Sequence, residues 1–264
     1  MYRVSCAPSE VHHPTIVQPA VLDSLSPLEL LFAAGILILA FVVRGITGFG
    51  SGLIAIPLLA LMLPISVVVP MVALLDYLAA LSHGLKHRNH VRWREILPLL
   101  PFTLTGVVTA LYLFQTLDTQ LLTRALGVFV LLFAVHSLLG LQPQRQGSRW
   151  WAIPAGGFGG LIGTLFGTGG PFYVIYLQLR HLDKTTFRAT IATVFLLDGG
   201  ARLVGYIGSG FYTPSTLWLV LAALPVMAAA LYAGGHIHTT IRPETFRRAI
   251  GVLLLGSGTA LLLK

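Results

Sequence analysis

The chain has 264 residues, of which 55% are hydrophobic and only 10% are charged, and its mean hydropathy is +0.83. A water-soluble fold would lack the polar side chains to cover its surface, so this composition predicts an integral membrane protein. The net charge of +8 is not gathered in a soluble basic domain, which argues against nucleic-acid binding, and a single cysteine, Cys6, excludes an intramolecular disulfide or a cysteine metal cluster.

The first 27 residues are polar and contain several prolines, with Arg3 as their only Lys or Arg. A cleavable signal peptide needs a basic start followed directly by an apolar core, and this stretch has neither. We therefore expect residues 1–27 to form a short extramembrane tail.

Eight to ten apolar segments follow, and their number depends on how two glycine-rich breaks are counted. In chain order they cover 27–43, 53–63, 66–85, 96–114, 121–141, 150–166, 172–179, 189–208, 216–233 and 246–263. A helix that crosses a bilayer needs about 20 apolar residues. We expect an all-α membrane fold in which the short segments beside each break form a discontinuous helix pair.

Both breaks are glycine-rich and end on a proline: GITGFGSGLIAIP at 45–57 and GGFGGLIGTLFGTGGP at 156–171. Free backbone amides are costly in hydrocarbon, so a break is tolerated only where it is buried in protein or lines a polar cavity. Helices beginning at Leu53 and Phe172 would direct amides and positive dipole ends toward a small anion. The alternative is that the glycines simply allow close helix packing.

The second half of the chain repeats the first. Gly48 and Gly50 recur as Gly167 and Gly169, and RALGV at 124–128 recurs as RAIGV at 248–252, at a nearly equal separation. Such duplicated landmarks predict two five-segment repeats, 28–141 and 150–264, joined by a linker at 142–149.

Loop charges indicate that the two repeats are inverted, because Lys and Arg mark the cytoplasmic side. Residues 86–94 carry four Lys or Arg, whereas the matching residues 209–215 carry none. Conversely, residues 63–66 are uncharged, whereas their match, 180–188, holds three Lys or Arg. The linker is then cytoplasmic and both termini lie outside. Inverted repeats are typical of secondary transporters, whose site lies near the midplane at broken helices.

The candidate substrate-binding residues are the arginine, hydroxyl and glycine residues at the two breaks. They are Arg44, Thr47, Gly48, Gly50, Ser51, Gly52, Thr164, Gly167, Thr168, Gly169 and Gly170. Arg44 could hold a sulfite or sulfonate by bidentate hydrogen bonds, or it could snorkel to the lipid headgroups. The equivalent place in the second break is Gly163, which offers no cation.

Asp76, Asp198 and Arg202 lie within otherwise apolar segments, where ionisable groups are costly and usually functional. Asp198 and Arg202 are four residues apart and so are expected to form an ion pair on one helical face. Asp76 has no cation close to it in sequence, so it is the better candidate for proton coupling, ahead of Asp198. A histidine group at positions 83, 87 and 90 lies mostly in a basic loop, and we expect no metal and no cofactor.

Four stretches, GFGSGLIAIPLL, GGFGGLIGTLFGTGGPFYVIYL, VRWREILPLL and PETFRRAIGVLLLG, occur in this order along the chain. Together they resemble the sulfite exporter TauE/SafE family, also called the toluene sulfonate uptake permease family, over residues 28–263. The resemblance implies a multi-pass bacterial inner-membrane transporter of two inverted halves for sulfite, sulfonates, sulfoacetate and related anions, without an ATPase subunit. Ser51, where the family often has glycine, and Pro171 and Phe172 depart from its pattern.

The sequence therefore predicts a secondary transporter, not an enzyme, that moves a small sulfur-containing oxyanion by alternating access. Export is favoured for a sulfite-like anion, because the inside-negative membrane potential drives anions outward. The alternatives are an anion channel, an uptake permease for an organosulfonate coupled to protons or sodium, and a membrane-embedded scaffold without transport. The lipid bilayer and the anion are the expected partners; a homo-oligomer and a coupling ion are left open.

Overall fold

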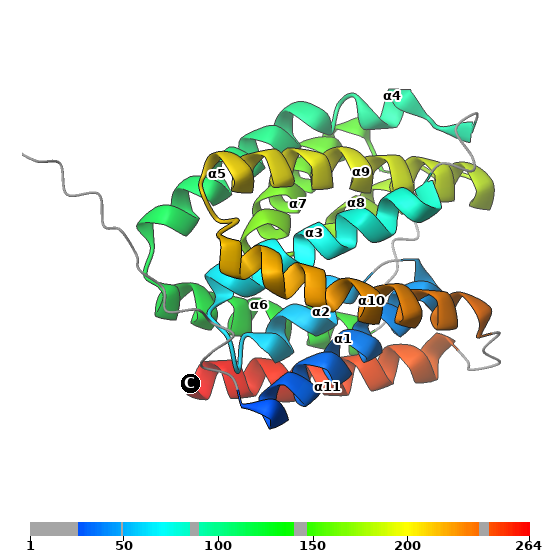
Figure 1. Cartoon of the computed structure of the whole chain (residues 1–264). Helices are drawn as coiled ribbons and strands as arrows, with labels where there is room; N and C mark the ends of the chain where they lie inside the picture. Colours follow the sequence, from blue (N-terminus) through cyan, green and yellow to red (C-terminus); the bar gives the residue numbers. More distant parts are fainter. Residues whose placement is uncertain (1–25, 49, 85–89, 140–146, 238–242) are drawn as a thin grey trace, which may run out of the picture.

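The computed structural model describes residues 26–48, 50–84, 90–139, 147–237 and 243–264, and these residues form helices and connections without a strand (Figure 1). The helices are α1 (Pro27–Thr47), α2 (Ser51–Leu59), α3 (Ile65–Gly84), α4 (Trp93–Ile96), α5 (Leu100–Thr116), α6 (Thr119–Leu139), the 3₁₀ helix η2 (Arg149–Trp151), α7 (Ala152–Phe166), α8 (Gly170–Leu179), α9 (Lys184–Gly208), α10 (Pro214–His236) and α11 (Pro243–Leu263). The all-α prediction is confirmed, and each expected apolar segment contains a helix, although α2 ends at Leu59 and not at Leu63.

Several helix boundaries differ from the sequence prediction. The first helix does not end at Val43 but continues through Arg44 to Thr47, so the arginine lies inside α1. The expected segment 96–114 is divided into α4 and α5, since Pro98 and Pro101 follow each other closely and proline lacks the N–H that a continuous helix needs.

Four helices are long and apolar enough to cross a membrane: Pro27–Thr47, Thr119–Leu139, Thr185–Gly208 and Pro214–His236. Large apolar side chains cover their outward faces, among them Phe32, Leu132, Val204 and Trp218, each at least 59% exposed. An exposed apolar surface of this extent suits lipid and would be unfavourable in water.

The helix starts follow ordinary capping chemistry. At α1, the Ser26 hydroxyl accepts a hydrogen bond from the Glu29 N–H, and the Glu29 carboxylate accepts one from the Ser26 N–H. At α9 and α10, the side chains of Asp183 and Thr213 each accept a hydrogen bond from a first-turn N–H. These caps pair amides that the helix itself leaves free.

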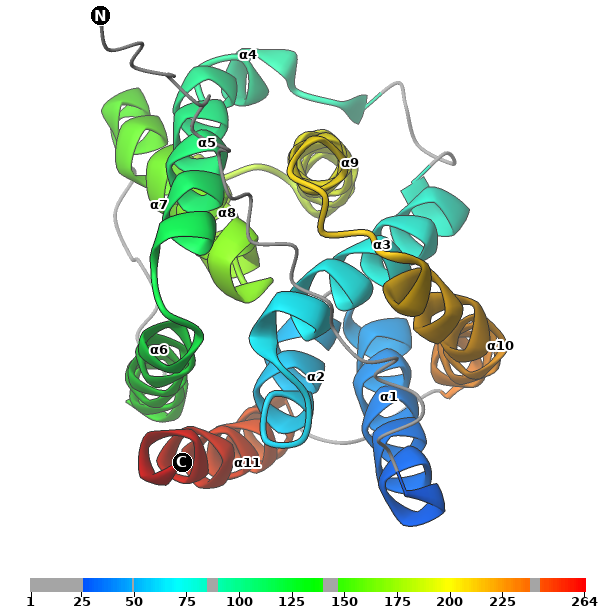
Figure 2. The ribbon, with the colours of Figure 1, turned by 60° about the vertical axis from the view of Figure 1, so that its left-hand side comes forward.

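The two halves of the chain interlock instead of packing as separate bodies. Helix α5 of the first half packs against α7 of the second, and α10 of the second packs against α1 of the first. Helices α3 and α9 also contact each other, as do α6 and α11, and the predicted repeat matches the members of each pair. Figure 2 shows α1 and α10 on one side, α5, α7 and α8 on the other, and α3 and α9 between them.

Glycines at the exchanged contacts let the helix backbones touch. A Cβ on Gly45 of α1 would lie 2.7 Å from the Leu231 carbonyl oxygen of α10, and one on Gly156 of α7 would lie 2.7 Å from the Leu99 carbonyl oxygen just before α5. The packing interpretation of the glycine-rich breaks is therefore correct for these positions.

Helix α2 occupies the centre of the molecule, with eight of its nine residues buried. Nine residues of α-helix span only about 14 Å, roughly half of the hydrocarbon core. Because α2 also packs against α1, the helix that precedes it, the two helices form a hairpin at the first break.

Candidate functional site

Both breaks are made by glycines in the left-handed backbone region. Gly48 ends α1 with a φ of 85°, and Gly50 precedes α2 with a φ of 97°. In the second half, Gly167 ends α7 with a φ of 65°. Residues with a Cβ rarely adopt these angles, so glycine is required at each turn. Helices α2 and α8 begin at Ser51 and Gly170, each two residues earlier than predicted.

The two breaks meet at the centre of the molecule. A Cβ on Gly52 would lie 2.5 Å from the carbonyl oxygen of Gly167, so the first break contacts the second directly. A cavity of about 90 Å³ lies beside this contact. From the first half it is lined by Arg44, Gly50, Gly52, Leu53, Ala73, Asp76, Tyr77, Ala80 and Phe133, and from the second by Gly167, Thr168, Gly169, Gly170, Pro171, Phe195, Gly199 and Arg202.

Arg44 forms the polar centre of the first half. Its Nη1 lies 2.8 Å from Asp76 Oδ1 and 2.9 Å from Ser51 Oγ, and its Nη2 donates to the Asp76 carbonyl oxygen at 2.9 Å. Ser51 Oγ donates in turn to Asp76 Oδ1. Arg44 is 9% exposed and is held inside the protein by these bonds, so it does not snorkel to the headgroups.

Asp76 has no cation close to it in sequence, but the fold places Arg44 beside it. The sequence separation of 32 residues between the partners concealed the contact, which exists because α1 and α3 both border the first break. Asp76 keeps 22% of its side chain exposed, so the pair faces the cavity and is not sealed from it.

The second half carries a related ion pair. Arg202 Nη2 lies 2.7 Å from Asp198 Oδ2, which confirms the predicted pair on one face of α9. Arg202 Nη1 also donates to the Gly163 carbonyl oxygen at 2.8 Å. Gly163 is the position equivalent to Arg44, so the second half does place a cation there, supplied by a different helix. The buried Tyr173 hydroxyl donates to the other carboxylate oxygen, Asp198 Oδ1, at 3.1 Å.

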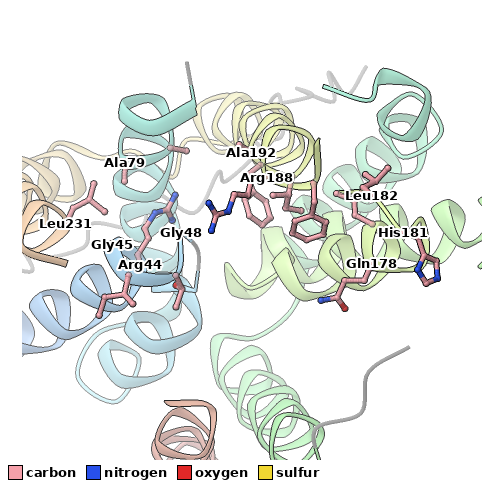
Figure 3. Close-up of a pocket in the computed structure, with 17 residues that line it drawn as sticks. Arg44, Gly45, Gly48, Ala79, Gln178, His181, Leu182, Arg188, Ala192 and Leu231 are labelled. Atoms are coloured by element: carbon pink, nitrogen blue, oxygen red, sulfur yellow. The ribbon is translucent and has the colours of Figure 1, made fainter. Parts of the chain in front are cut away.

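A larger cavity of about 760 Å³ adjoins the small one, and Arg44, Ala80 and Phe195 line both. Its walls include the end of α1, the end of α8 and the first turns of α9. Figure 3 shows Arg44 and Arg188 reaching into it from opposite sides, with Gln178 and His181 along one wall. Two guanidinium groups at one opening favour anions.

The family model "Sulfite exporter TauE/SafE" matches residues 31–261, nearly the whole chain. The chain belongs to this family. It is 30% identical over 195 residues to the "Probable inner membrane transporter protein TsaS" of Comamonas testosteroni, an alignment that covers 72% of this chain and 81% of that protein. It is 28% identical over 229 residues to the "Probable sulfite/organosulfonate exporter TauE" of Cupriavidus necator, covering 83% and 88%. No solved structure matches it.

Membership of the TauE/SafE family makes the chain a membrane transporter and not an enzyme. The long apolar helices and the inner-membrane relative agree in describing a multi-pass protein of the bacterial inner membrane. The sequence resemblance and the predicted transporter class are thereby confirmed.

The predicted site residues of this TauE/SafE protein fall into three groups. Those that line the small cavity are Arg44, Gly50, Gly52, Asp76, Gly167, Thr168, Gly169 and Gly170. Thr47 and Gly48 line the larger cavity instead. Ser51, Thr164 and Asp198 stand behind the cavity walls, where Ser51 is bound to Asp76 and Asp198 is bound to Arg202. The histidine group lies largely outside the described residues, since only His90 of the three has a described side chain.

Sequence reasoning assigned Arg202 only to an ion pair and overlooked its place in the cavity wall. One signal could have found it: Asp76 and Asp198 are separated by almost the same interval as the two breaks. An aspartate at the same place in each repeat suggests that the arginines beside them serve equivalent sites.

Proposed function

We propose that this protein is a secondary transporter that exports a small sulfur-containing oxyanion, such as sulfite, sulfoacetate or another sulfonate, by alternating access. The observation that carries the proposal is the cavity between the two breaks, because it joins buried cations, glycine backbone and helix N-termini at one point. The name of the Cupriavidus relative, a sulfite/organosulfonate exporter, supports the class of substrate.

The chemistry of the cavity suits a group with three equivalent oxygens on sulfur. A guanidinium presents parallel N–H donors that match two of those oxygens. The starts of α2 and α8 contribute the positive ends of their helix dipoles, and the glycines allow an anion to approach the backbone closely. Each of these features also lowers the cost of moving an anion through a low-dielectric interior.

The proposed architecture is two inverted repeats, 28–141 and 150–264, and the helix packing supports it. The repeat matches α1 with α7 and α5 with α10. A two-fold relation between the halves therefore turns the α5–α7 contact into the α10–α1 contact, and both contacts are observed. In Figure 1, α3 runs from left to right and α9 from right to left. The start of α1 and the C-terminus lie at the same end, where Lys264 Nζ donates to the Ala60 and Leu61 carbonyl oxygens.

An opening at one end of the small cavity and an aromatic cluster at the other support an inward-open state. The larger cavity is lined by His181 and Arg188, which belong to the basic segment 180–188 that marks the cytoplasmic side. At the opposite end of the small cavity, Tyr206, Phe211 and Tyr212 form an aromatic cluster with Phe114. Tyr212 donates to the Pro70 carbonyl oxygen at 3.0 Å, so the cluster bridges α3 and closes that end.

Asp76 is the proposed coupling residue if a proton takes part. Its carboxylate competes with a bound anion for Arg44, since Asp76 Oδ1 occupies the Arg44 Nη1 donor that the anion would use. Protonation of Asp76 would release Arg44 for the anion, which links one proton to one anion bound. Asp198 suits this role less well, because it is 2% exposed and enclosed by Arg202 and Tyr173. Driven by the inward proton gradient, this linkage would serve ion-coupled uptake of an organosulfonate, the alternative to export.

Flux into proteoliposomes tests the proposal. Purified protein should exchange internal sulfite for external labelled sulfite with saturation, and the Arg44→Lys variant should lose most of this exchange. Arg124→Gln changes an exposed arginine on α6, remote from both cavities, and should exchange at the wild-type rate. Unsaturable flux without exchange would indicate an anion channel. No movement of sulfite, sulfoacetate, thiosulfate or taurine would refute transport of a sulfur oxyanion.

A further inference from the structure

Arg202 has hydrogen-bonding capacity that its own ion pair does not use. The Nη1 and Nη2 atoms are bound to Gly163 and Asp198, but Nε finds no hydrogen-bond partner among the described residues, although it is buried. A buried guanidinium donor left unpaired costs free energy, and such donors are uncommon unless a ligand or water completes them. Arg202 lines the small cavity, so a ligand there could reach it.

Thr168 provides a second unused donor in the same wall. It is 3% exposed and lines the small cavity, yet its Oγ1 has no hydrogen-bond partner in the described part of the chain. Thr168 stands between Gly167 and Gly169 at the start of α8, where the helix dipole also favours an anion. Two residues with unpaired buried donors, Arg202 on α9 and Thr168 in the loop before α8, therefore line one small cavity.

Arg44 and Arg202 come from opposite halves. Arg44 enters the small cavity from α1, beside the first break, whereas Arg202 enters from α9 and is bonded to α7, beside the second break. Each arginine is paired with the aspartate of its own half, so the cavity is close to neutral before an anion enters. An anion between them would contact both halves of the transporter at once.

We propose that the transported anion is clamped between Arg44 and Arg202, with Thr168 Oγ1 as a third donor, and that this clamp admits only compact oxyanions. The inference rests on the proposed function and specifies its substrate class. A clamp with one arginine from each half ties occupancy of the site to the relative position of the halves. The arrangement thus supplies the link between binding and movement that alternating access needs.

The size of the cavity limits the substrate. A volume of about 90 Å³ is equal to roughly six to nine buried waters at 10–15 Å³ of the same measure each. Sulfite, with four heavy atoms, fits this space, and a sulfonate with a methyl group fits it closely. An aromatic sulfonate exceeds this volume, so its ring would have to lie in the larger cavity, whose lining shares Arg44, Ala80 and Phe195 with the small one. Binding should therefore weaken as the carbon substituent grows.

Binding measurements on the purified full-length protein test the clamp. Sulfite, methanesulfonate and p-toluenesulfonate are titrated into wild type, Arg202→Lys and Thr168→Val by calorimetry. We expect sulfite affinity to fall roughly 10- to 100-fold in Arg202→Lys, which loses the planar fork of donors but keeps the charge, and several-fold in Thr168→Val. Arg149→Lys makes the same change at an arginine paired with Glu95, outside both cavities, and should bind as wild type does.

Arginine Nε resonances give a readout that does not depend on variants. In wild-type protein, the Arg202 Nε–H signal should shift on addition of sulfite and should shift far less with p-toluenesulfonate. Wild-type sulfite affinity in folded Arg202→Lys would overturn the clamp. An Arg202 Nε–H signal that does not shift while sulfite binds would overturn it as well. Equal affinity for sulfite and p-toluenesulfonate would overturn the size limit. If wild type binds none of the anions, the proposed function itself fails, whereas the outcomes above leave it standing.

Discussion

The closest approach of the two breaks can be tested by adding one methyl group. In Gly52→Ala, the new Cβ would lie 2.5 Å from the Gly167 carbonyl oxygen and 3.5 Å from Asp76 Oδ2. Carbon and oxygen normally approach to about 3.3 Å, so the breaks must separate by about 0.8 Å. Gly52 does not have a positive φ, so alanine adds no backbone strain and its effect is steric.

The expected penalty follows from overpacking of a buried contact, which costs about 1–3 kcal/mol. For a protein of this size each kcal/mol lowers the unfolding temperature by about 2–4 °C, which predicts a loss of about 2–12 °C for Gly52→Ala. The methyl also enters a cavity of about 90 Å³, so sulfite affinity should fall as well. Thermal unfolding in detergent, followed by tryptophan fluorescence, and calorimetric titration with sulfite measure the two effects.

Gly35→Ala is the matched control. Its Cβ would meet nothing within 4 Å, and Gly35 lies in the regular part of α1. Alanine is the better helix former, so the unfolding temperature should stay equal or rise slightly, with sulfite affinity unchanged. If Gly52→Ala behaves like Gly35→Ala in both assays, the two breaks do not meet as described.

Three further predictions concern ion pairs and a helix cap. Asp76→Asn removes the carboxylate that competes for Arg44, so sulfite exchange should persist while its stimulation by a pH gradient disappears; unchanged stimulation would exclude Asp76 as the coupling residue. Glu95→Gln removes the buried charge that Arg149 and Arg180 share and should cost about 2–4 kcal/mol of unfolding free energy. Arg149→Gln should cost less than about 1 kcal/mol, because Arg149 is half exposed. Equal losses of the two variants in thermal unfolding would contradict the buried network. Hydrogen bonds from the Thr186 hydroxyl and N–H lower the pKa of Asp183. The Asp183 charge therefore stabilises α9 above the unfolded-state pKa, and this contribution is lost as the pH falls through the lowered pKa. Unfolding temperatures of wild type and Asp183→Asn should converge in acid, and a constant difference would contradict the cap.

Most of the fold could be predicted from sequence because the apolar runs are long and the breaks are marked by glycine. Each expected segment contains a helix, and positive φ angles occur at Gly48, Gly50 and Gly167, where the duplicated pattern indicated turns, whereas Gly169, the match of Gly50, has a φ of −66°. What a hydropathy pattern does not contain is which helices touch. The exchange of α5 and α10 between the halves depends on glycine-to-carbonyl contacts between distant segments.

The site could be predicted only in part, for the same reason. Glycines and hydroxyls beside a break are visible in the sequence, and most of them line the cavity. The pairing of Arg44 with Asp76 needs the hairpin of α1 and α2 to bring α3 alongside, and the reach of Arg202 to Gly163 needs α9 beside α7. A search confined to charges close in sequence finds the Asp198–Arg202 pair but overlooks these longer-range contacts.

The central claim is that one anion binds between the two breaks. Selenite has the shape and charge of sulfite and scatters X-rays anomalously, so crystals of the protein soaked in selenite would locate the anion directly. We predict one anomalous peak in the small cavity, within hydrogen-bonding distance of Arg44, Thr168 and Arg202. A peak confined to the larger cavity near Arg188, with the small cavity empty, would contradict the account.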